Sequence, residues 1–237
     1  MKNWQEDQMQ ILLSMESEQQ LLQKLILMTK ELGFDYCSYG LRSPFPVSNP
    51  KTVMLNNYPD VWQKQYKDQN YLAIDPTIKR GMQSLLPFVW SNEVFSPAYE
   101  FWEEAQSFGL RFGWVQSSYD IHGIFGLLSL GRSNEKLSDT ELLDKCPKMM
   151  WLTQIAHQTL SQCITPKLIP ETEAKLSNRE IEVLRWTAEG KTSSEIGDIL
   201  NLSECTINFH INNAMTKLNA TNKTAAAIRA MTLRLLS

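Results

Sequence analysis

Several hydrogen-bonding side chains stand in or beside apolar stretches in the first two-thirds of the sequence. Ser129 lies within the apolar run Leu127–Leu130, where a buried hydroxyl needs a partner. Asp75 lies between Ile74 and Pro76. The residues that stand out in this way are Ser38, Arg42, Tyr58, Trp62, Asp75 and Ser129. Their chemistry is hydrogen bonding: an indole N–H only donates, an ionised carboxylate only accepts, and a hydroxyl does both.

Each of these residues also has a purely structural interpretation. Asp75 can act as the N-cap of a helix that has Pro76 in its first turn. Tyr58 and Trp62 can be ordinary core aromatics, because buried aromatic clusters are usually core. The residue types alone leave both interpretations open.

A second kind of chemistry is indicated by Leu176–Leu218. Ser177 with Glu180, and Thr192 with Glu195, have the spacing of capping boxes and predict the starts of two helices. A turn then precedes a third helix, whose polar face is expected to carry Asn208, Phe209, Asn212 and Thr216. A short helix, a tight turn and a second helix with a polar outer face fit a DNA major groove. A small helical bundle with no DNA role has the same periodicity.

The first 163 residues alternate between helical and strand patterns. Helices are expected in 4–33 (two), from 58 and 75 onward, at 97–109, and at 139–163 with an interruption or kink near Pro147. Strands are expected at 34–42, 52–56, 87–90, 112–119 and 123–132, the last two as a hairpin. This order predicts an α+β chain: an α/β/α sandwich with a mainly antiparallel sheet, then an all-α helix-turn-helix domain. We expect domains at 1–163 and 176–237, joined by a linker at 164–175.

Composition limits the function classes. A chain of 237 residues that is 43% hydrophobic predicts two folded domains, and a net charge of −3 argues against indiscriminate nucleic-acid binding. The four cysteines lack a CxxC spacing and are expected to be buried thiols in a reducing compartment. The three histidines lack metal-ligand spacing, so no metal is expected. The polar, acidic start and the absence of a long apolar run predict a soluble, cytoplasmic protein with no membrane contact.

Two groups of sequence motifs resemble those of one known protein family. Leu176–Glu180, Glu189–Lys191 and Thr206–His210 closely resemble the LuxR-type DNA-binding domain. Further residues have an order and spacing similar to the autoinducer-binding domain of LuxR-type quorum-sensing regulators: Trp62, Tyr66, Asp75, Pro76, Trp90 and Gly113. The resemblance covers nearly the whole chain. It implies a ligand-responsive transcription factor that binds an inverted-repeat promoter site as a homodimer, with RNA polymerase as a further partner.

By this resemblance the ligand is an N-acyl homoserine lactone of medium to long chain, and no cofactor is needed. Trp62 suits the lactone carbonyl, Asp75 the amide N–H, and Tyr58 with Ser129 the amide carbonyl. Ser38 and Arg42 suit a 3-oxo or 3-hydroxy group. The binding residues implied are Ser38, Gly40, Arg42, Val53, Tyr58, Trp62, Tyr66, Asp75, Ile78, Trp90, Phe101, Leu110, Leu127 and Ser129.

The resemblance also implies a DNA-binding surface and a second copy of the chain. The DNA-binding residues implied are Thr192, Ser194, Thr206, Asn208, Phe209, Asn212, Asn213, Lys217 and Lys223. Lysine is common in the family at Asn208, so the departure leaves the operator sequence open. The last helix, expected at Thr221–Leu235, has an alanine- and methionine-rich face suited to pairing two DNA-binding domains.

Two other function classes require features that can be looked for in the sequence. A phosphorylation-controlled response regulator shares this DNA-binding domain, but it needs a receiver domain with a phosphoacceptor Asp and an acidic pair, and the aromatic-rich first domain shows neither. An enzyme such as a lactone hydrolase needs a nucleophile or a metal set. The sequence has no GxSxG motif, so no catalytic residues are expected.

Overall fold

The computed structural model describes residues 4–236, which fall into two compact units. The first unit comprises the chain up to Arg42 together with Thr52–Asp120 and Phe125–Ile164. The second comprises Ser43–Lys51, Ile121–Ile124 and the chain from Thr165 onward. The strands of the described chain all belong to the first unit, and helices α8–α11 belong to the second.

A five-stranded antiparallel sheet forms the middle layer of the first unit. The strands are β1 (Tyr36–Arg42), β2 (Thr52–Asn56), β3 (Phe88–Val89), β4 (Phe112–Tyr119) and β5 (Phe125–Arg132). Their spatial order is β2-β1-β5-β4-β3, and all the pairs are antiparallel. The predicted hairpin is confirmed as β4 and β5, which pair from Phe112 with Arg132 to Tyr119 with Phe125.

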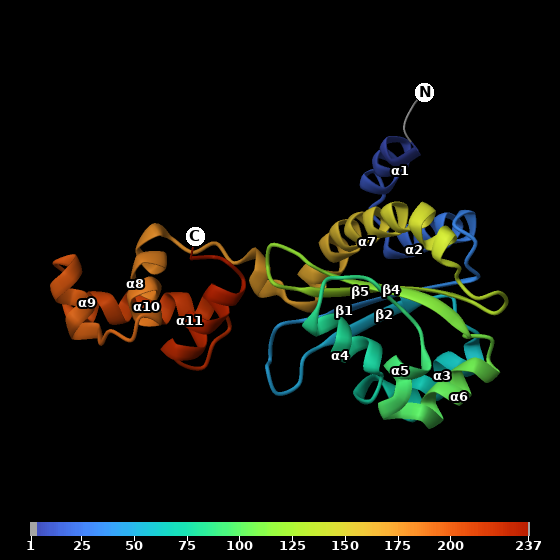
Figure 1. Cartoon of the computed structure of the whole chain (residues 1–237). Coiled ribbons are helices and arrows are strands. Elements are labelled where there is room, and N and C mark those ends of the chain that lie inside the picture. Colours follow the sequence, from blue (N-terminus) through green and yellow to red (C-terminus); the bar gives the residue numbers. More distant parts are fainter. Residues whose placement is uncertain (1–3, 237) are drawn as a thin grey trace. The chain divides into compact units, whose positions relative to one another are not determined.

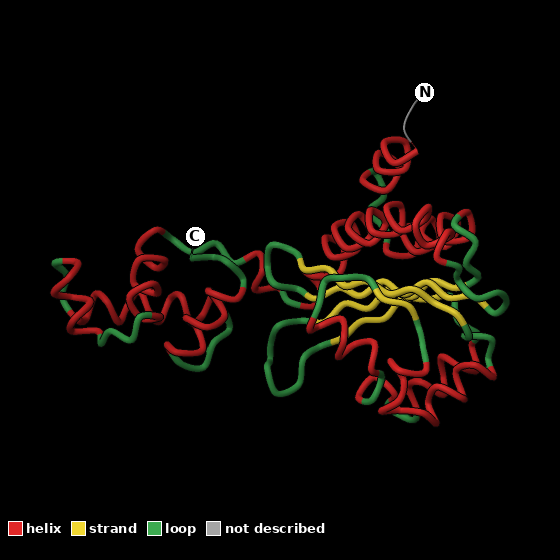
Figure 2. Tube along the Cα trace, viewed as in Figure 1, coloured by secondary structure: helices red, strands yellow, loops and turns green. Residues whose placement is uncertain are grey.

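Helices cover both faces of this sheet, which makes the unit an α/β/α sandwich as predicted (Figures 1 and 2). One face carries α2 (Glu18–Glu31), which follows α1 (Trp4–Leu13), and α7 (Asp139–Leu168). The other face carries α3 (Asp60–Asp68), α4 (Pro76–Gln83), α5 (Asn92–Phe95) and α6 (Tyr99–Ser107). Short 3₁₀ segments lie at Tyr71–Ala73, Ser96–Ala98 and Pro170–Glu173.

The long helix α7 differs from the expected one. It continues through Pro147 and Pro166 and ends at Leu168 rather than at Cys163, so the predicted interruption near Pro147 is wrong. A proline inside a helix removes a hydrogen bond and costs about 3 kcal/mol. Burial of one apolar side of the helix offsets that cost, because four of its side chains are fully buried: Met149, Leu152, Ala156 and Leu160.

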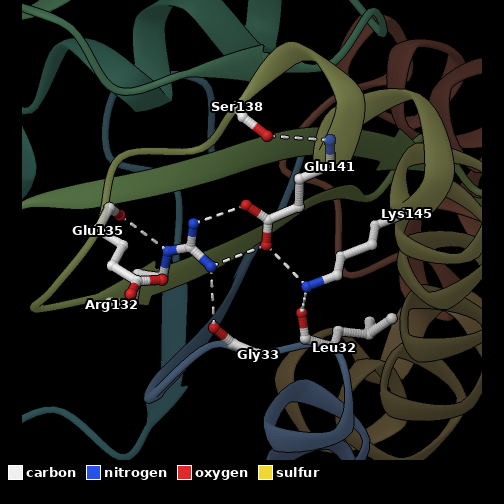
Figure 3. A network of polar contacts seen from close by, with 7 residues as sticks. All are labelled: Leu32, Gly33, Arg132, Glu135, Ser138, Glu141 and Lys145. Carbon is white, nitrogen blue, oxygen red and sulfur yellow. Dashed lines mark hydrogen bonds and ion pairs between the residues drawn. The ribbon is translucent and has the colours of Figure 1, made fainter.

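A charged network fastens the helices on this face to the sheet (Figure 3). Arg132, at the end of β5, donates to both carboxylate oxygens of Glu141 in α7, at 2.8 and 2.7 Å. Lys145 donates to Glu141 and to the carbonyl of Leu32 at the end of α2, both at 2.7 Å. The hydrogen bonds from Arg132 are the largest cause that lowers the pKa of Glu141 to about 2; partial burial acts against them, and Lys145 adds to them.

The second unit contains the four helices α8 (Asn178–Ala188), α9 (Ser193–Leu200), α10 (Glu204–Lys217) and α11 (Lys223–Thr232). Both predicted capping boxes are confirmed: Ser177 accepts from the N–H of Glu180, Thr192 accepts from that of Glu195, and each glutamate bonds back. Two apolar clusters hold the helices together. Their fully or almost fully buried members are Leu184, Ala214, Leu218, Ala226 and Ala230 in one, and Val183, Ile196, Ile207 and Ile211 in the other.

The cysteines do not all fit the expectation of buried thiols. Cys37 is buried, and its burial raises the pKa of the thiol to about 11, but Cys205 is exposed and the other two are half-buried. All four are free. Across the described residues, none of the helices is long and apolar enough to span a membrane.

Candidate functional site

A cavity of about 80 Å³ lies in the first unit against β1, β2 and β5. By the same measure one water needs roughly 10–15 Å³, so the cavity has room for a chain of several heavy atoms. Helices α3, α4, α5 and α6 supply the opposite wall. The lining residues are Ser38, Gly40, Leu41, Arg42, Thr52, Met54, Tyr58, Trp62, Tyr66, Leu72, Asp75, Thr77, Ile78, Trp90, Phe95, Phe101, Trp102, Ala105, Leu110, Phe125, Leu127 and Ser129.

The sheet side of the cavity is organised in rows across the strands. Alternate strand residues point to the same face, so Ser38, Gly40 and Arg42 line the cavity from β1. Their partners on β5 also line it, because Ser38 pairs with Ser129, Gly40 with Leu127 and Arg42 with Phe125. The rows therefore run from two hydroxyls, through a glycine beside a leucine, to an arginine beside a phenylalanine.

Asp75 places a carboxylate in the wall of this cavity. It is the N-cap of α4: one oxygen, Oδ1, accepts from the Thr77 N–H at 2.9 Å and from the Thr77 hydroxyl at 2.6 Å. The other oxygen, Oδ2, accepts from the Tyr66 hydroxyl at 3.0 Å. Burial raises the pKa of Asp75 above its usual range, although these hydrogen bonds act in the opposite direction. Asp75 is therefore a cap and a cavity residue at once.

Two further hydroxyls stand near this carboxylate. Burial raises the pKa of the Tyr58 hydroxyl, and a hydrogen bond with Ser129 acts against that rise. Burial also raises the pKa of Tyr66, with the charge of Asp75 as the next cause. Both phenols therefore keep their protons at neutral pH, and Tyr66 uses its proton in the hydrogen bond to Asp75.

Aromatic rings close the cavity around these polar groups. Trp62 is 1% exposed and lies 5.4–5.7 Å, between ring centroids, from Tyr71, Phe101 and Phe108. Its indole N–H makes no hydrogen bond to the described residues, whereas the indole N–H of Trp102 donates to the side chain of Asn92 at 3.0 Å. The polar groups that line the cavity are thus one carboxylate and several hydrogen-bond donors, and apolar side chains surround them.

The indole ring of Trp90 packs directly against Gly113 and Gly131, where a side chain would collide with it. A Cβ on Gly113 would lie 2.3 Å from the Trp90 ring, and a Cβ on Gly131 would lie 2.9 Å from it. These two glycines face each other on β4 and β5, so any side chain there would displace the indole. The cavity wall at Trp90 depends on this pair.

Helices α9 and α10 of the second unit form a helix-turn-helix. Asn201 ends α9 in the left-handed conformation, with φ 53°, and the N–H of Leu202 donates to the carbonyl of Gly197 at 2.9 Å. A Cβ on Gly197 would lie 2.7 Å from the Leu202 carbonyl oxygen, so glycine permits this close turn. The Ser203 side chain then caps α10 by accepting from the Thr206 N–H at 3.1 Å.

The two faces of α10 differ as the spacing predicts. Ile207, Ile211 and Ala214 are buried against the other helices. The opposite face is exposed and carries Asn208, Asn212 and the ring of Phe209, which is 60% exposed. An exposed polar face on the second helix of this motif is the part that enters a DNA major groove.

Comparison with known proteins agrees with both sites. Residues 17–160 match the autoinducer binding domain, and residues 174–230 match the family described as bacterial regulatory proteins, luxR family. The transcriptional activator protein AnoR of Acinetobacter nosocomialis is 47% identical over the whole of both chains. The chain belongs to the LuxR family of quorum-sensing transcriptional regulators.

Solved structures in the LuxR family share this architecture. The crystal structure of Escherichia coli SdiA has a TM-score of 0.89 at 34% identity and covers 99% of this chain and 98% of its own. A structure of SdiA in complex with octanoyl-rac-glycerol has a TM-score of 0.86, also at 34% identity, over 98% and 95% of the two chains. The first domain of this regulator matches an autoinducer binding domain, so the response-regulator alternative is not favoured. LuxR-family proteins regulate transcription and are not enzymes.

The cavity of this LuxR-family protein brings together the predicted binding residues with one difference. All of them line it except Val53. Thr52 and Met54 line it instead, because strand residues alternate between faces and the two neighbours of Val53 point inward. The prediction that Val53 lines the cavity is therefore wrong, because it assigned Val53 to the inner face of β2.

Sequence reasoning missed several other lining residues. They are Leu41, Thr52, Met54, Leu72, Thr77, Phe95, Trp102, Ala105 and Phe125. Alternation along β5 would have found Phe125, which is two residues before Leu127. Phe95 and Trp102, which stack at 4.2 Å between centroids, come from different helices and had no sequence signal.

In the DNA-binding unit the predicted residues lie in different environments. Thr192, Ser194 and Lys223 are exposed, and Thr206 and Asn213 are half-buried. Lys217 forms an ion pair at 2.7 Å with Glu180, whose side chain is 5% exposed. Burial by itself would raise the pKa of Glu180, but the hydrogen bonds from Lys217 and from the Ser177 backbone outweigh it and hold that pKa below its usual range.

The last helix differs from the expected pairing surface. It spans Lys223–Thr232, and its alanines at 226, 227 and 230 are buried in the unit's own core rather than presented outward. The apolar side chains it exposes are Ile228, at 52%, and Met231, at 57%. These two residues, not the alanines, are what α11 offers to another surface.

Proposed function

We propose that this regulator binds an N-acyl homoserine lactone of medium to long chain in the cavity of its first unit. As a homodimer in the cytoplasm it then binds an inverted-repeat promoter site and controls transcription by RNA polymerase. The observation that carries the proposal is the set of polar groups in the cavity. One carboxylate acceptor, Asp75, stands with donors within a shell of aromatic rings. The polar groups and the apolar walls of the cavity therefore complement a ligand that carries an amide, a lactone and an apolar tail.

Asp75 can accept one more hydrogen bond, from an N–H donor of the ligand. A carboxylate offers about four acceptor sites, and the protein fills three of those of Asp75 with Tyr66 and the two groups of Thr77. The amide N–H of the ligand takes the remaining one. Because a buried charge with an incomplete set of hydrogen bonds is costly, this bond favours the bound state.

The other polar groups of the ligand face donors. Trp62 donates its indole N–H to the lactone carbonyl, since that N–H has no acceptor among the described residues. Tyr58 and Ser129 donate to the amide carbonyl, and Ser38 lies beside them in the same row. The acyl chain then crosses the Gly40–Leu127 row on its way toward Arg42. The related SdiA was solved with octanoyl-rac-glycerol, which also carries an acyl chain.

The second unit supplies the DNA contacts. In the homodimer two α10 helices enter successive major grooves about one helical turn apart, so the operator is an inverted repeat. Asn208, Phe209 and Asn212 face the bases, and Lys223 faces a phosphate. Ile228 and Met231 of α11 supply apolar surface for contact between the two copies. The ligand promotes this state to the extent that it binds the DNA-competent dimer more tightly than other states.

Footprinting tests this proposal. The full-length protein, purified with and without decanoyl-homoserine lactone, is footprinted on its own promoter targets. Protection of two half-sites in inverted orientation, at a lower protein concentration when the lactone is present, is expected. Protection of a single half-site, or equal protection with and without any of a hexanoyl to dodecanoyl series, contradicts the proposal.

A further inference from the structure

The two asparagines on the exposed face of α10 differ in what holds them. Asn208 and Asn212 lie one helical turn apart. The hydroxyl of Ser193, the first residue of α9, donates to the Oδ1 atom of Asn208 at 2.7 Å. Besides the backbone bonds of the helix, Asn212 uses its carbonyl to accept from the Thr216 hydroxyl at 3.0 Å, and among the described residues its side-chain amide is unpartnered.

Ser193 is well placed to fix the orientation of that amide. It is 8% exposed, and it directly follows Thr192, whose capping box with Glu195 sets the start of α9. A buried hydroxyl costs free energy when it lacks a partner, so the bond to Asn208 persists rather than being exchanged for water. With Oδ1 turned toward α9, the NH₂ group of Asn208 is the part of the amide that faces outward.

This orientation changes what Asn208 can recognise. Asparagine reads adenine with both ends of the amide: Oδ1 accepts from N6 and the NH₂ group donates to N7. A donor alone is met by N7 of either purine, by O6 of guanine and by O4 of thymine, so it separates the bases poorly. The side-chain amide of Asn212 is free to turn both ends toward one base, whereas the bond from Ser193 fills one of the two acceptor sites of Asn208 Oδ1 and holds that oxygen toward α9.

The structure assigns unequal roles to these residues. Asn212 is the adenine-specific residue of each half-site, and Asn208 donates one bond that discriminates little. Ser193 is a positioning residue: its hydrogen bond orients the Asn208 amide so that only the NH₂ group faces the bases. This inference rests on the proposed function, since it presumes that α10 enters the major groove of an inverted repeat. Beyond that function, it names the side chain that sets the operator sequence.

Selection from a random duplex library tests the assignment. Full-length wild type and variants are purified from cells grown with a mixture of hexanoyl- to dodecanoyl-homoserine lactones, and bound duplexes are sequenced. Ser193→Ala frees Oδ1 of Asn208. The expected result is a new adenine preference of about five- to a hundredfold at one position per half-site, the range that a bidentate contact supplies. The double variant Ser193→Ala/Asn208→Ala loses that preference.

Asp198→Asn is the control, because Asp198 is exposed and lies in the same helix, α9, as Ser193. It leaves base preference unchanged. A second pair of variants keeps the test decisive if Ser193→Ala unfolds: Asn208→Ala changes base preferences by less than about twofold, whereas Asn212→Ala flattens one adenine position. Strong adenine loss in Asn208→Ala, or an unchanged profile in a folded Ser193→Ala, overturns the assignment. If wild type enriches no inverted repeat at all, the proposed function fails instead.

Discussion

Gly40 offers the most direct control over the length of acyl chain that the cavity accepts. It lies in the middle row of the sheet floor, between Met54 and Leu127, and both of these neighbours line the cavity. A Cβ built on Gly40 meets no atom within 4 Å, so a side chain there would project into open space. Gly40→Leu should therefore fill part of the cavity without straining the strand.

The expected magnitude follows from the position of this row. Gly40 is two residues along β1 from Ser38, which is about 7 Å and the span of about five methylene groups. A leucine side chain displaces about three or four methylenes of any chain that reaches farther. At about 0.8 kcal/mol for each buried methylene, a dodecanoyl chain loses roughly 2.4–3.2 kcal/mol, or about fifty- to two-hundredfold in affinity. A butanoyl chain ends before this row and keeps its affinity.

Ligand-dependent thermal or urea unfolding measures the effect, because a bound ligand stabilises the folded state by an amount set by its concentration and Kd. Gly113→Ala is the contrasting control: its Cβ would lie 2.3 Å from the Trp90 ring, so it should lower stability by about 1–3 kcal/mol and weaken both ligands. Equal losses for the butanoyl and dodecanoyl lactones in Gly40→Leu, or no loss for either, would refute this account of the cavity.

Three further predictions concern single residues. Asp75→Asn loses a charge-assisted hydrogen bond to the amide N–H and should weaken lactone binding about ten- to a hundredfold by calorimetry; unchanged affinity in a folded variant contradicts its role. Glu141→Gln leaves Arg132, 7% exposed, without its anion and should lower the free energy of unfolding by about 2–3 kcal/mol at neutral pH. Because the pKa of Glu141 is depressed to about 2, this contribution is present above its ordinary value of 4.5 and is lost as pH falls toward 2, so the difference in urea stability should vanish there; a difference that is independent of pH is the contrary result. Lys223→Ala should weaken binding to all DNA sequences alike and lower the slope of log affinity against log salt by about one unit, and a sequence-dependent loss would assign Lys223 to base contact.

Local sequence signals predicted most of the fold. Strand alternation and turn residues located β1, β2, β4 and β5, and the two capping boxes located α8 and α9. Local sequence signals gave a wrong prediction where tertiary packing outweighed the conformational preference of a single residue. Pro147 predicts a break, yet α7 continues through it, because one side of the helix is buried along much of its length.

The site was predictable where the family resemblance supplied roles and less so where faces had to be chosen. Asp75 was recognised as a helix cap and as a ligand acceptor, and the structure shows that one carboxylate can serve both. Val53 was placed wrongly because β2 is short and both of its faces carry apolar residues, so alternation did not identify the inner one. The engagement of Lys217 with Glu180 and of Asn208 with Ser193 depends on contacts between helices, which a single sequence does not reveal.

The central claim is that the cavity holds an N-acyl homoserine lactone. Mass spectrometry of small molecules that copurify with the protein tests it most directly. Cells expressing the full-length chain are fed an equimolar mixture of acyl homoserine lactones, and the purified protein is denatured and extracted. The account predicts enrichment of medium- to long-chain lactones, close to one per chain, by wild type, and marked loss of that enrichment by Asp75→Asn. Recovery of no lactone from folded wild type, or equal recovery from the Asp75 variant, would contradict it.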